Sequence, residues 1–277
     1  MHITATQCLK ALPDNLDRAL VYGDGLFETI AVFDGAPPLW CYHKSRLSVS
    51  LNRLGIPADI AVIEETVLSI AAQAGSGLLR LFVTRGGGQR GYDPRTARSC
   101  TMTVELFPLP SYPDAIVKSG ISLHLCKHVL PRNPALAGLK HTNRLDHVLA
   151  SAEWDRQWER EGLLLDDTGA VIEGTISNVF IVRSGILQTP GLDSCGVAGV
   201  MRAWILDTVA ERLSLQVEIR RLTLADVLAA DECFVCNSVF GVWSVRKIGV
   251  AFLEKRSSIT EDILEQVWLK GYGRLYA

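Results

Sequence analysis

Helix-like and strand-like hydrophobic patterns alternate along the whole chain, and this alternation limits the fold more than any other feature of the sequence. In the first part we expect helices at residues 44–54 and 59–74 and strands at residues 78–84 and 101–107. The stretch Pro108-Leu-Pro-Ser-Tyr-Pro113 then breaks both periods. We therefore expect an α+β protein with two domains, residues 1–110 and residues 111–277, rather than one doubly wound sheet.

The second half repeats the alternation with more strands. We expect strands at residues 121–126, 162–165, 176–182, 186–189, 233–236 and 242–245. Helices are expected at residues 142–160, after Gly196-Val-Ala-Gly199, and from about Thr260 to the end. The helix after Gly199 should turn its apolar side chains towards the core.

Composition excludes several classes of protein. A chain of 277 residues with 48% hydrophobic side chains can bury a substantial core. The net charge of -2, without runs of Lys and Arg, gives no electrostatic footprint for nucleic acid. No apolar stretch reaches the roughly 20 residues of a membrane span, and the first residues do not resemble a signal peptide. We expect a cytoplasmic protein whose seven cysteines are reduced.

The cysteines and histidines do not predict a metal site. Cys233-x-x-Cys236 is a lone pair inside an apolar run, which is more typical of core cysteines than of zinc ligands. His124 and His128 are four residues apart, but Leu123 and Leu125 suggest a strand rather than a metal-binding helix.

A glycine-rich loop follows the strand at residues 78–84. Gly86-Gly-Gly88-Gln-Arg-Gly91 has the spacing GxGxxG, but no helix opens at its third glycine, so a dinucleotide site is disfavoured. Arg85 and Arg90 suggest a basic loop that holds a carboxylate, although an ordinary solvated hairpin loop fits the composition equally well.

Three features could together carry chemistry. Lys140 lies just before the expected helix at residues 142–160, where burial and the helix dipole would lower its pKa. Glu173 precedes a Gly-Thr turn, and Gly196–Gly199 open a helix that could bind phosphate. Taken singly, each has an ordinary explanation, as a surface lysine, a turn acid and a helix cap.

Motifs in the order of a known family connect these features. Tyr22-Gly-Asp-Gly-Leu-Phe-Glu-Thr29, His43-x-x-Arg46-Leu47, Glu173 and Gly196-Val-Ala-Gly-Val-Met-Arg202 resemble the fold-type IV pyridoxal-phosphate enzymes. That family includes D-amino-acid and branched-chain aminotransferases and aminodeoxychorismate lyases. The resemblance covers nearly the whole chain and implies their two-domain α+β fold, pyridoxal 5'-phosphate as cofactor, and a homodimer.

Three segments are most similar to the lyase branch. They are the lysine segment Lys140-His-Thr-Asn-Arg-Leu145, the loop Gly88-Gln-Arg-Gly-Tyr92, and Ala230-Asp-Glu-Cys-Phe-Val-Cys-Asn-Ser238. Arg90-Gly-Tyr92 departs from the Arg-x-His of D-amino-acid aminotransferases, and Cys236-Asn237 departs from the Gly-Thr of branched-chain aminotransferases. Both departures disfavour transamination.

The resemblance assigns cofactor contacts residue by residue. Lys140 is expected to bind pyridoxal phosphate covalently as a Schiff base and to move protons, and Glu173 to pair with the pyridine nitrogen. The phosphate contacts are expected from Arg46, Asn237 and the backbone at Val200 and Met201.

The remaining roles concern the substrate. Thr29 is expected to deliver a proton to the leaving group, and Arg90 and Tyr92 to contact substrate carboxylate, across a dimer interface as in relatives. The implied reaction converts 4-amino-4-deoxychorismate to 4-aminobenzoate and pyruvate in folate biosynthesis. An aminotransferase of the same fold and a non-catalytic pyridoxal-phosphate-binding protein stay open as alternatives.

Overall fold

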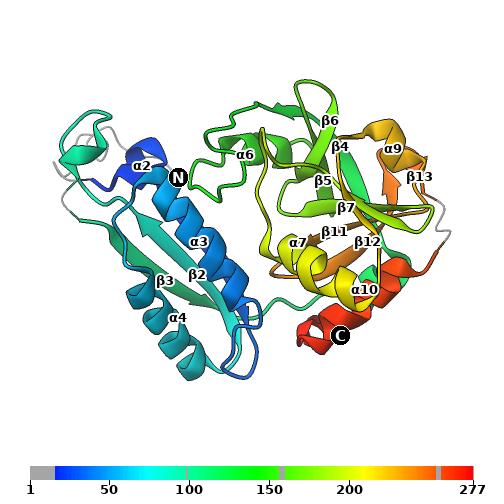
Figure 1. Ribbon diagram of the computed structural model, residues 1–277, viewed down its shortest axis with the longest axis horizontal. Helices are drawn as coiled ribbons and strands as arrows, with labels where there is room; N and C mark the ends of the chain where they lie inside the picture. The colour runs from blue at the N-terminus through cyan, green and yellow to red at the C-terminus, as the bar shows by residue number, and fades with distance from the viewer. Residues whose placement is uncertain (1–15, 98, 156–159, 254–256, 277) are drawn as a thin grey trace, which may run out of the picture.

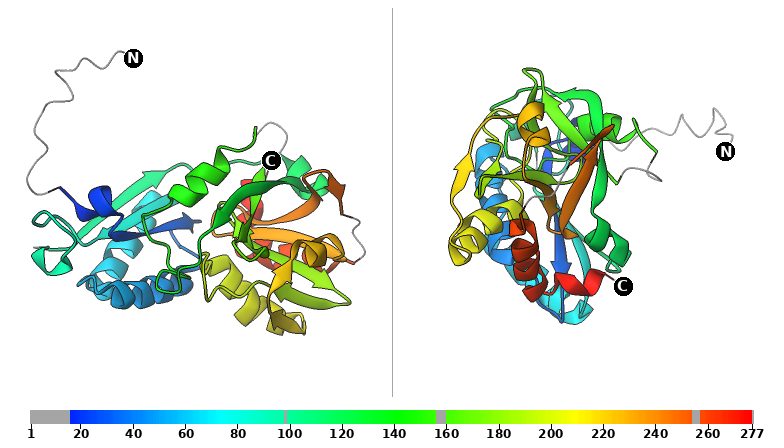
Figure 2. Two further views of the ribbon diagram at one scale, coloured as in Figure 1. Left: turned by 90° about the horizontal axis from the view of Figure 1, so that it is seen from above. Right: turned by 90° about the vertical axis from the view of Figure 1, so that its right-hand side faces the viewer.

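The computed structural model describes residues 16–97, 99–155, 160–253 and 257–276, and it places them in two lobes side by side (Figure 1; Figure 2). The N-terminal lobe runs from α2 (Arg18–Tyr22) to β3 (Thr101–Phe107), and the C-terminal lobe from α5 (Asp114–Ser119) to η3 (Tyr272–Leu275). Each lobe has its own sheet. The domain boundary at residue 110 stays a prediction, and this separation of the sheets supports it.

The N-terminal lobe is a three-stranded antiparallel sheet with two helices on one face. The strands are β1 (Gly25–Val32), β2 (Gly77–Thr84) and β3, in that order, and the helices are α3 (Trp40–Leu54) and α4 (Ile60–Ala74). Alternate residues of β2, from Leu79 to Val83, pack under the helices. The opposite face of β1 presents Phe27 and Thr29, which reach the cavity described below. The expected helices and strands of this lobe are confirmed, with α3 beginning four residues early.

The C-terminal lobe is built on a ten-stranded mixed sheet of order β10-β6-β5-β4-β12-β11-β7-β8-β9, with β13 beside β12. Its strands are β4 (Ile121–Leu130), β5 (Glu161–Asp166), β6 (Ala170–Gly174), β7 (Asn178–Arg183), β8 (Ile186–Thr189), β9 (Val217–Ile219), β10 (Leu222–Thr223), β11 (Glu232–Asn237), β12 (Gly241–Ile248) and β13 (Ala251–Phe252). An extra pairing between Glu173 of β6 and Asn178 of β7 brings the two strands together beside their short turn.

Both faces of the central strands β7 and β11 are buried. The helix that begins with α7 (Val200–Trp204) continues through η2 (Ile205–Val209) and α8 (Ala210–Arg212), and it packs on one face together with α10 (Ile259–Leu269). The shorter α9 (Leu224–Leu228) contributes Val227 to the other face. Central strands buried on both faces are hydrophobic at successive positions, as residues 179–182 of β7 are.

Cys233 and Cys236 illustrate this arrangement. They lie three positions apart on β11, and because strand side chains alternate, they point to opposite faces of the sheet. Cys236 packs in the cluster under α7, and Cys233 packs in the cluster on the other side. Burial raises the pKa of both thiols to about 12. The prediction of core cysteines is confirmed.

The long helix expected at residues 142–160 is wrong. In the described part of this range, residues 142–155 and 160, the structure has only α6 (Leu145–Ser151), and residues 156–159 lie outside the described residues. The chain turns away because Glu153 accepts hydrogen bonds from the backbone N–H groups of Lys127 and His128, at 2.6 and 2.7 Å. Trp154 also stacks on His124, with ring centroids 5.4 Å apart. These contacts with β4 hold residues 153 and 154 in positions that a continuing helix could not reach.

Candidate active site

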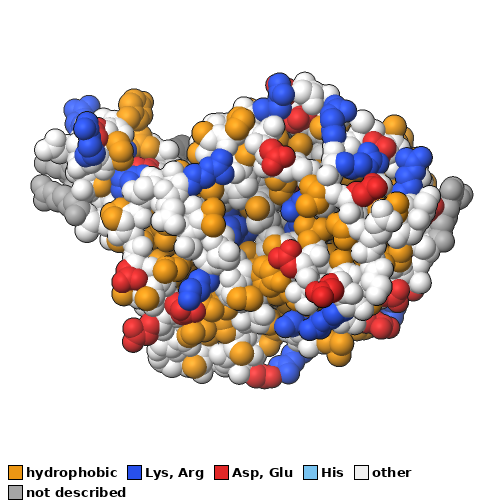
Figure 3. Space-filling view, in the orientation of Figure 1, with side chains coloured by type: hydrophobic (Ala, Val, Ile, Leu, Met, Phe, Trp, Pro, Cys, Tyr) orange, Lys and Arg blue, Asp and Glu red, His pale blue; other side chains and the backbone are white. Residues whose placement is uncertain are grey.

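A cavity of about 390 Å³ lies between the two lobes, where the molecular surface is hollowed (Figure 3). Its wall combines β1 and α3 of the N-terminal lobe with the Lys140 segment, the β6–β7 turn, the start of α7 and the end of β11. Its wall includes side chains with polar groups: Thr29, Arg46, Tyr112, Lys140, Arg144, His147, Glu173, Thr175, Ser177, Asn178, Asn237 and Ser238. The structure therefore brings together most of the residues that the sequence pointed to.

Lys140 enters the cavity from a segment without regular secondary structure. Its Nζ lies 4.2 Å from the centroid of the Phe27 ring, and its carbonyl accepts a hydrogen bond from the Phe27 N–H at 3.0 Å. Burial, and then the positive charges of Arg46 and Arg144, lower the pKa of Lys140 to about 8. The predicted pKa lowering is present, but the cause differs in part, because α6 begins only at Leu145.

Beneath Arg46 lies a buried carboxylate that sequence reasoning missed. Glu28 is 1% exposed; its carboxylate accepts a hydrogen bond from Arg46 Nε at 2.8 Å and a second from Arg46 Nη2, and lies 2.7 Å from His43 Nδ1. Burial alone would raise the pKa of Glu28, but the charges and hydrogen bonds of Arg46 and His43 lower it to about 2. The sequence does contain a sign of this buried acid. Glu28 lies between Leu26 and Ile30 on the same face of β1, where alternation predicts an apolar side chain.

Glu173 belongs to strand β6 rather than to a loop, and its carboxylate is almost fully buried. One oxygen lies 3.0 Å from His147 Nε2, and the other accepts a hydrogen bond from the Val197 N–H at 2.8 Å. Asn178 holds the same segment, because its side-chain amide donates to the Val197 carbonyl at 2.8 Å. These contacts fix the carboxylate at the cavity wall.

The β6–β7 turn, residues 175–177, is held from below by a second buried acid. Glu161 accepts hydrogen bonds from the backbone and hydroxyl of Thr175, from the Ile176 N–H at 3.2 Å and from the Ser177 hydroxyl at 2.8 Å. Asn237 holds the same turn from β11, because its side-chain amide donates to the Ile176 carbonyl at 3.0 Å. Its side-chain oxygen accepts from residues 239 and 240. The Asn237 side chain thus positions this wall of the cavity.

The beginning of α7 forms another part of the wall. Gly199 is the residue before the first helical turn, and Val200 lines the cavity. Met201 also belongs to this first turn, but its side chain lies in the core, so that only its backbone is available to a ligand. A Cβ atom at Gly199 would come within 1.9 Å of the Asn178 side-chain oxygen. Glycine at this position therefore lets Asn178 pack against the start of α7, whose first backbone N–H groups have no partner within the helix.

Arg90 and Tyr92 do not line this cavity. Both are exposed, Tyr92 to 84%. The Tyr92 ring lies 5.2 Å from the ring of Tyr22, and its carbonyl accepts a hydrogen bond from Arg18 at 3.0 Å. Within one chain, the structure therefore keeps this loop apart from Lys140.

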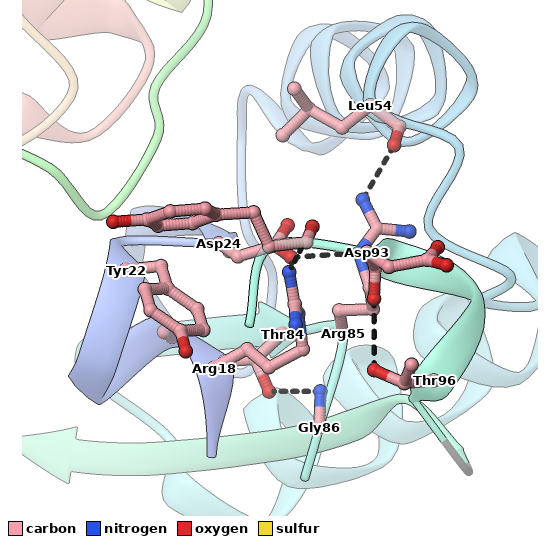
Figure 4. A network of polar contacts seen from close by, with 12 residues as sticks. Arg18, Tyr22, Asp24, Leu54, Thr84, Arg85, Gly86, Asp93 and Thr96 are labelled. Atoms are coloured by element: carbon pink, nitrogen blue, oxygen red, sulfur yellow. Dashed lines mark hydrogen bonds and ion pairs between the residues drawn. The ribbon is translucent and has the colours of Figure 1, made fainter. Parts of the chain in front are cut away.

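Arg85 is not a carboxylate clamp for a ligand, and that part of the loop prediction is wrong. Its Nε donates to Asp24 at 2.8 Å, and one terminal nitrogen donates to the Leu54 carbonyl at the end of α3 (Figure 4). The other terminal nitrogen donates to the Gly55 carbonyl. Arg85 is nearly fully buried and satisfies helix-end carbonyls that have no partner within the helix.

The residues of the cavity fit pyridoxal phosphate. An amine with a lowered pKa suits covalent attachment to an aldehyde, and a buried carboxylate suits a pyridinium nitrogen. Arg46 and the backbone at the start of α7 suit a phosphate. Within the described ranges, no group of three or more metal-ligating side chains exists, and no helix is long and apolar enough to cross a membrane.

Comparison with known proteins defines the class of the chain. Residues 25–248 match the family described as amino-transferase class IV, and the chain belongs to that family. The match spans both lobes and every strand from β1 to β12.

Particular relatives carry the comparison further. The chain is 36% identical to an aminodeoxychorismate lyase of Vibrio harveyi over 84% of this chain and 86% of the relative. It is similar to the crystal structure of 4-amino-4-deoxychorismate lyase from Pseudomonas aeruginosa, with 42% identity, a TM-score of 0.88, and coverage of 93% and 95% of the two chains. The crystal structure of a T.th. branched-chain amino acid aminotransferase with pyridoxamine 5'-phosphate is 25% identical, with a TM-score of 0.82 and coverage of 96% and 91%.

Proposed function

We propose that this chain is a pyridoxal-phosphate-dependent lyase that converts 4-amino-4-deoxychorismate to 4-aminobenzoate and pyruvate, a step of folate biosynthesis. The observation that carries the proposal is a lysine with a pKa of about 8 in the cavity wall that also holds the Glu173 carboxylate. The identity of 36% and 42% with two lyases over most of the chain supports this reaction over the others of the family.

Several residues of the cavity have a place in this reaction. Pyridoxal phosphate supplies an aldehyde for covalent attachment and a ring that withdraws electrons. Lys140 is the attachment point, and its Nζ removes the proton from the substrate carbon that bears the amine. Glu173 holds a proton at the ring nitrogen. Arg46, Asn237 and the backbone at Val200 and Met201 bind the phosphate.

The substrate side involves fewer residues. Thr29 lies on the cavity wall contributed by β1, and its hydroxyl delivers a proton to the oxygen of the leaving enolpyruvyl group. Asn237 keeps the β6–β7 turn against the cofactor through its bond to Ile176. The apolar ring of Phe27 beside Lys140 excludes water from the amine.

We also propose that a second copy of the chain completes the site with Arg90 and Tyr92. Helix α6 supports a dimer, because Leu145, Val148 and Leu149 form one exposed apolar face, with exposures of 68%, 60% and 57%. Residues three and four apart on a helix share a face, so these side chains form a continuous surface next to the Lys140 segment.

The cytosol is the compartment that we propose for this step.

Borohydride reduction followed by peptide mapping tests the attachment point. We expect the cofactor on the peptide that contains Lys140, and pyruvate with 4-aminobenzoate as products without any added keto acid. Lys140→Ala should lose turnover almost completely. Turnover that requires a keto acid would identify an aminotransferase instead, and bound cofactor without turnover of any amine would identify a binding protein.

Mixing two inactive variants tests the dimer. Lys140→Ala and Arg90→Ala each lack one component, and their heterodimer contains one site with both residues only if Arg90 crosses the interface. We expect activity to return on mixing. No return, in a preparation shown to have exchanged subunits, would contradict the shared site.

A further inference from the structure

The segment that carries Lys140 has no helix or sheet ladder to hold it, yet three successive backbone carbonyls of this segment accept hydrogen bonds. The Lys140 carbonyl accepts the Phe27 N–H at 3.0 Å. The carbonyls on either side belong to Leu139 and His141, and both accept hydrogen bonds from Arg144, at 2.9 and 2.8 Å. One guanidinium therefore spans the attachment residue from its N-terminal to its C-terminal neighbour.

Arg144 is well placed for this contact. It lines the cavity together with Lys140 and is the residue immediately before helix α6. A guanidinium presents several N–H donors in a rigid planar fork, so one side chain can hold two carbonyl groups in fixed relative positions. A lysine ammonium is a point charge on a flexible stem and lacks this geometry.

We propose that Arg144 is a positioning residue for Lys140, which holds the two flanking carbonyls and thereby fixes the direction in which the lysine side chain enters the cavity. This inference rests on the proposed function, in which Lys140 is the attachment point. It adds a role for a residue of the Lys-His-Thr-Asn-Arg segment that contacts the backbone carbonyls on either side of the lysine rather than the reacting atoms.

Electrostatics adds a second consequence. Burial is the main cause that lowers the pKa of Lys140, and the charges of Arg46 and Arg144 lower it further. Loss of the Arg144 charge should therefore raise the pKa of Lys140 and leave less neutral amine at pH 7. Substitution of Arg144 by lysine keeps the positive charge but loses the two hydrogen bonds of the planar guanidinium, so it separates the effect of charge from that of geometry.

The chain offers a matched control in Arg53. Its guanidinium also donates to two backbone carbonyls of the residues that precede Lys140, those of Ala137 at 2.8 Å and of Pro134. Arg53 itself does not line the cavity. Substitutions at Arg53 therefore measure the effect of removing an arginine that holds two backbone carbonyls near Lys140 but does not contact the carbonyls of Leu139 and His141.

The experiment follows covalent attachment rather than turnover. Full-length protein freed of cofactor is mixed with pyridoxal phosphate at pH 6 to 10, trapped with borohydride at set times, and mapped by mass spectrometry. The variants are Arg144→Lys, Arg144→Gln, Arg53→Lys and Arg53→Gln, and the melting temperature of each is measured alongside.

For Arg144→Lys we expect attachment at Lys140 to slow by about tenfold or more, since misplacement of a reacting group by about 1 Å costs as much as 100-fold. The pH at half-maximal rate should stay where it is in the parent protein. Arg144→Gln should slow attachment and also move that pH upward. The Arg53 variants should change neither the rate nor the pH.

Two results would overturn the inference. One is attachment by Arg144→Lys at the parental rate, and the other is equal slowing by Arg144 and Arg53 variants of equal melting temperature, which would show a general stabilising role. Failure of the proposed function is distinguishable, because in that case the parent protein itself would not be labelled at Lys140.

Discussion

Glu28→Gln is the substitution whose effect follows most directly from the structure. The carboxylate is 1% exposed and accepts hydrogen bonds from Arg46 while it contacts His43. Glutamine has nearly the same shape but no charge, so Arg46 would keep its buried positive charge without a counterion. Breaking a buried ion pair in this way costs about 3–5 kcal/mol.

The pKa of Glu28 gives a second route to the magnitude. Its fall from 4.5 to about 2 corresponds to about 3 kcal/mol, at about 1.4 kcal/mol for each pKa unit. Because the folded-state pKa is lowered, this stability is fully present above pH 4.5 and is lost as the pH falls towards 2. Glu28→Gln should therefore be less stable than the parent by about 3 kcal/mol at pH 7.

Urea unfolding of the two proteins at several pH values measures this difference. The gap should stay constant from pH 7 to about 4.5 and narrow below that. Glu105→Gln serves as a control, since the Arg80–Glu105 pair is 42% and 44% exposed and should contribute less than about 1 kcal/mol. A gap below 1 kcal/mol at pH 7, or one that persists unchanged to pH 3, would refute the reasoning.

Three further predictions use the same cavity and its supports. Glu161→Gln should lose about 2 kcal/mol of stability in urea unfolding, because an amide cannot accept all the hydrogen bonds of the β6–β7 turn. It should also bind pyridoxal phosphate more weakly in an absorbance titration, and unchanged cofactor affinity would disprove an effect of Glu161 on the cavity. Gly199→Ala should weaken cofactor binding by tenfold or more (about 1.4 kcal/mol) because its Cβ would lie 1.9 Å from the Asn178 oxygen, and a parental dissociation constant would contradict this. Arg85→Met should lower stability by about 2 kcal/mol or more without changing the rate of cofactor attachment at Lys140, since Arg85 binds carbonyls at the end of α3 and does not line the cavity. A changed attachment rate with parental stability would contradict this role.

The order of elements was readable from the sequence because hydrophobic periodicity records which face of each segment is buried. Helices α3 and α4 and strands β2 and β3 lie where the pattern placed them. No element was expected at α2, β1 or α5. The helix expected at residues 142–160 is shorter in the structure, although the hydrophobic pattern suited a helix. Contacts of Glu153 and Trp154 with β4 ended it after Ser151, and such contacts between distant segments leave no periodic signal.

The cavity residues divide in the same way. Lys140, Glu173 and Arg46 were found through motifs and do meet at one cavity. Glu28 was not assigned, although it belongs to a quoted motif, because only the packed structure shows that its carboxylate faces Arg46. Arg85 was assigned wrongly, because nothing local shows that the end of α3 lies beside it.

By itself, the sequence determined the class of fold, the family motifs and the lysine that we propose as the attachment point. The tertiary structure alone decided the state of that lysine. Its pKa of about 8 comes from burial between two lobes and from charges on α3 and before α6. Burial and Coulomb interactions depend on distance in space rather than on distance along the chain, and only the folded structure fixes those distances.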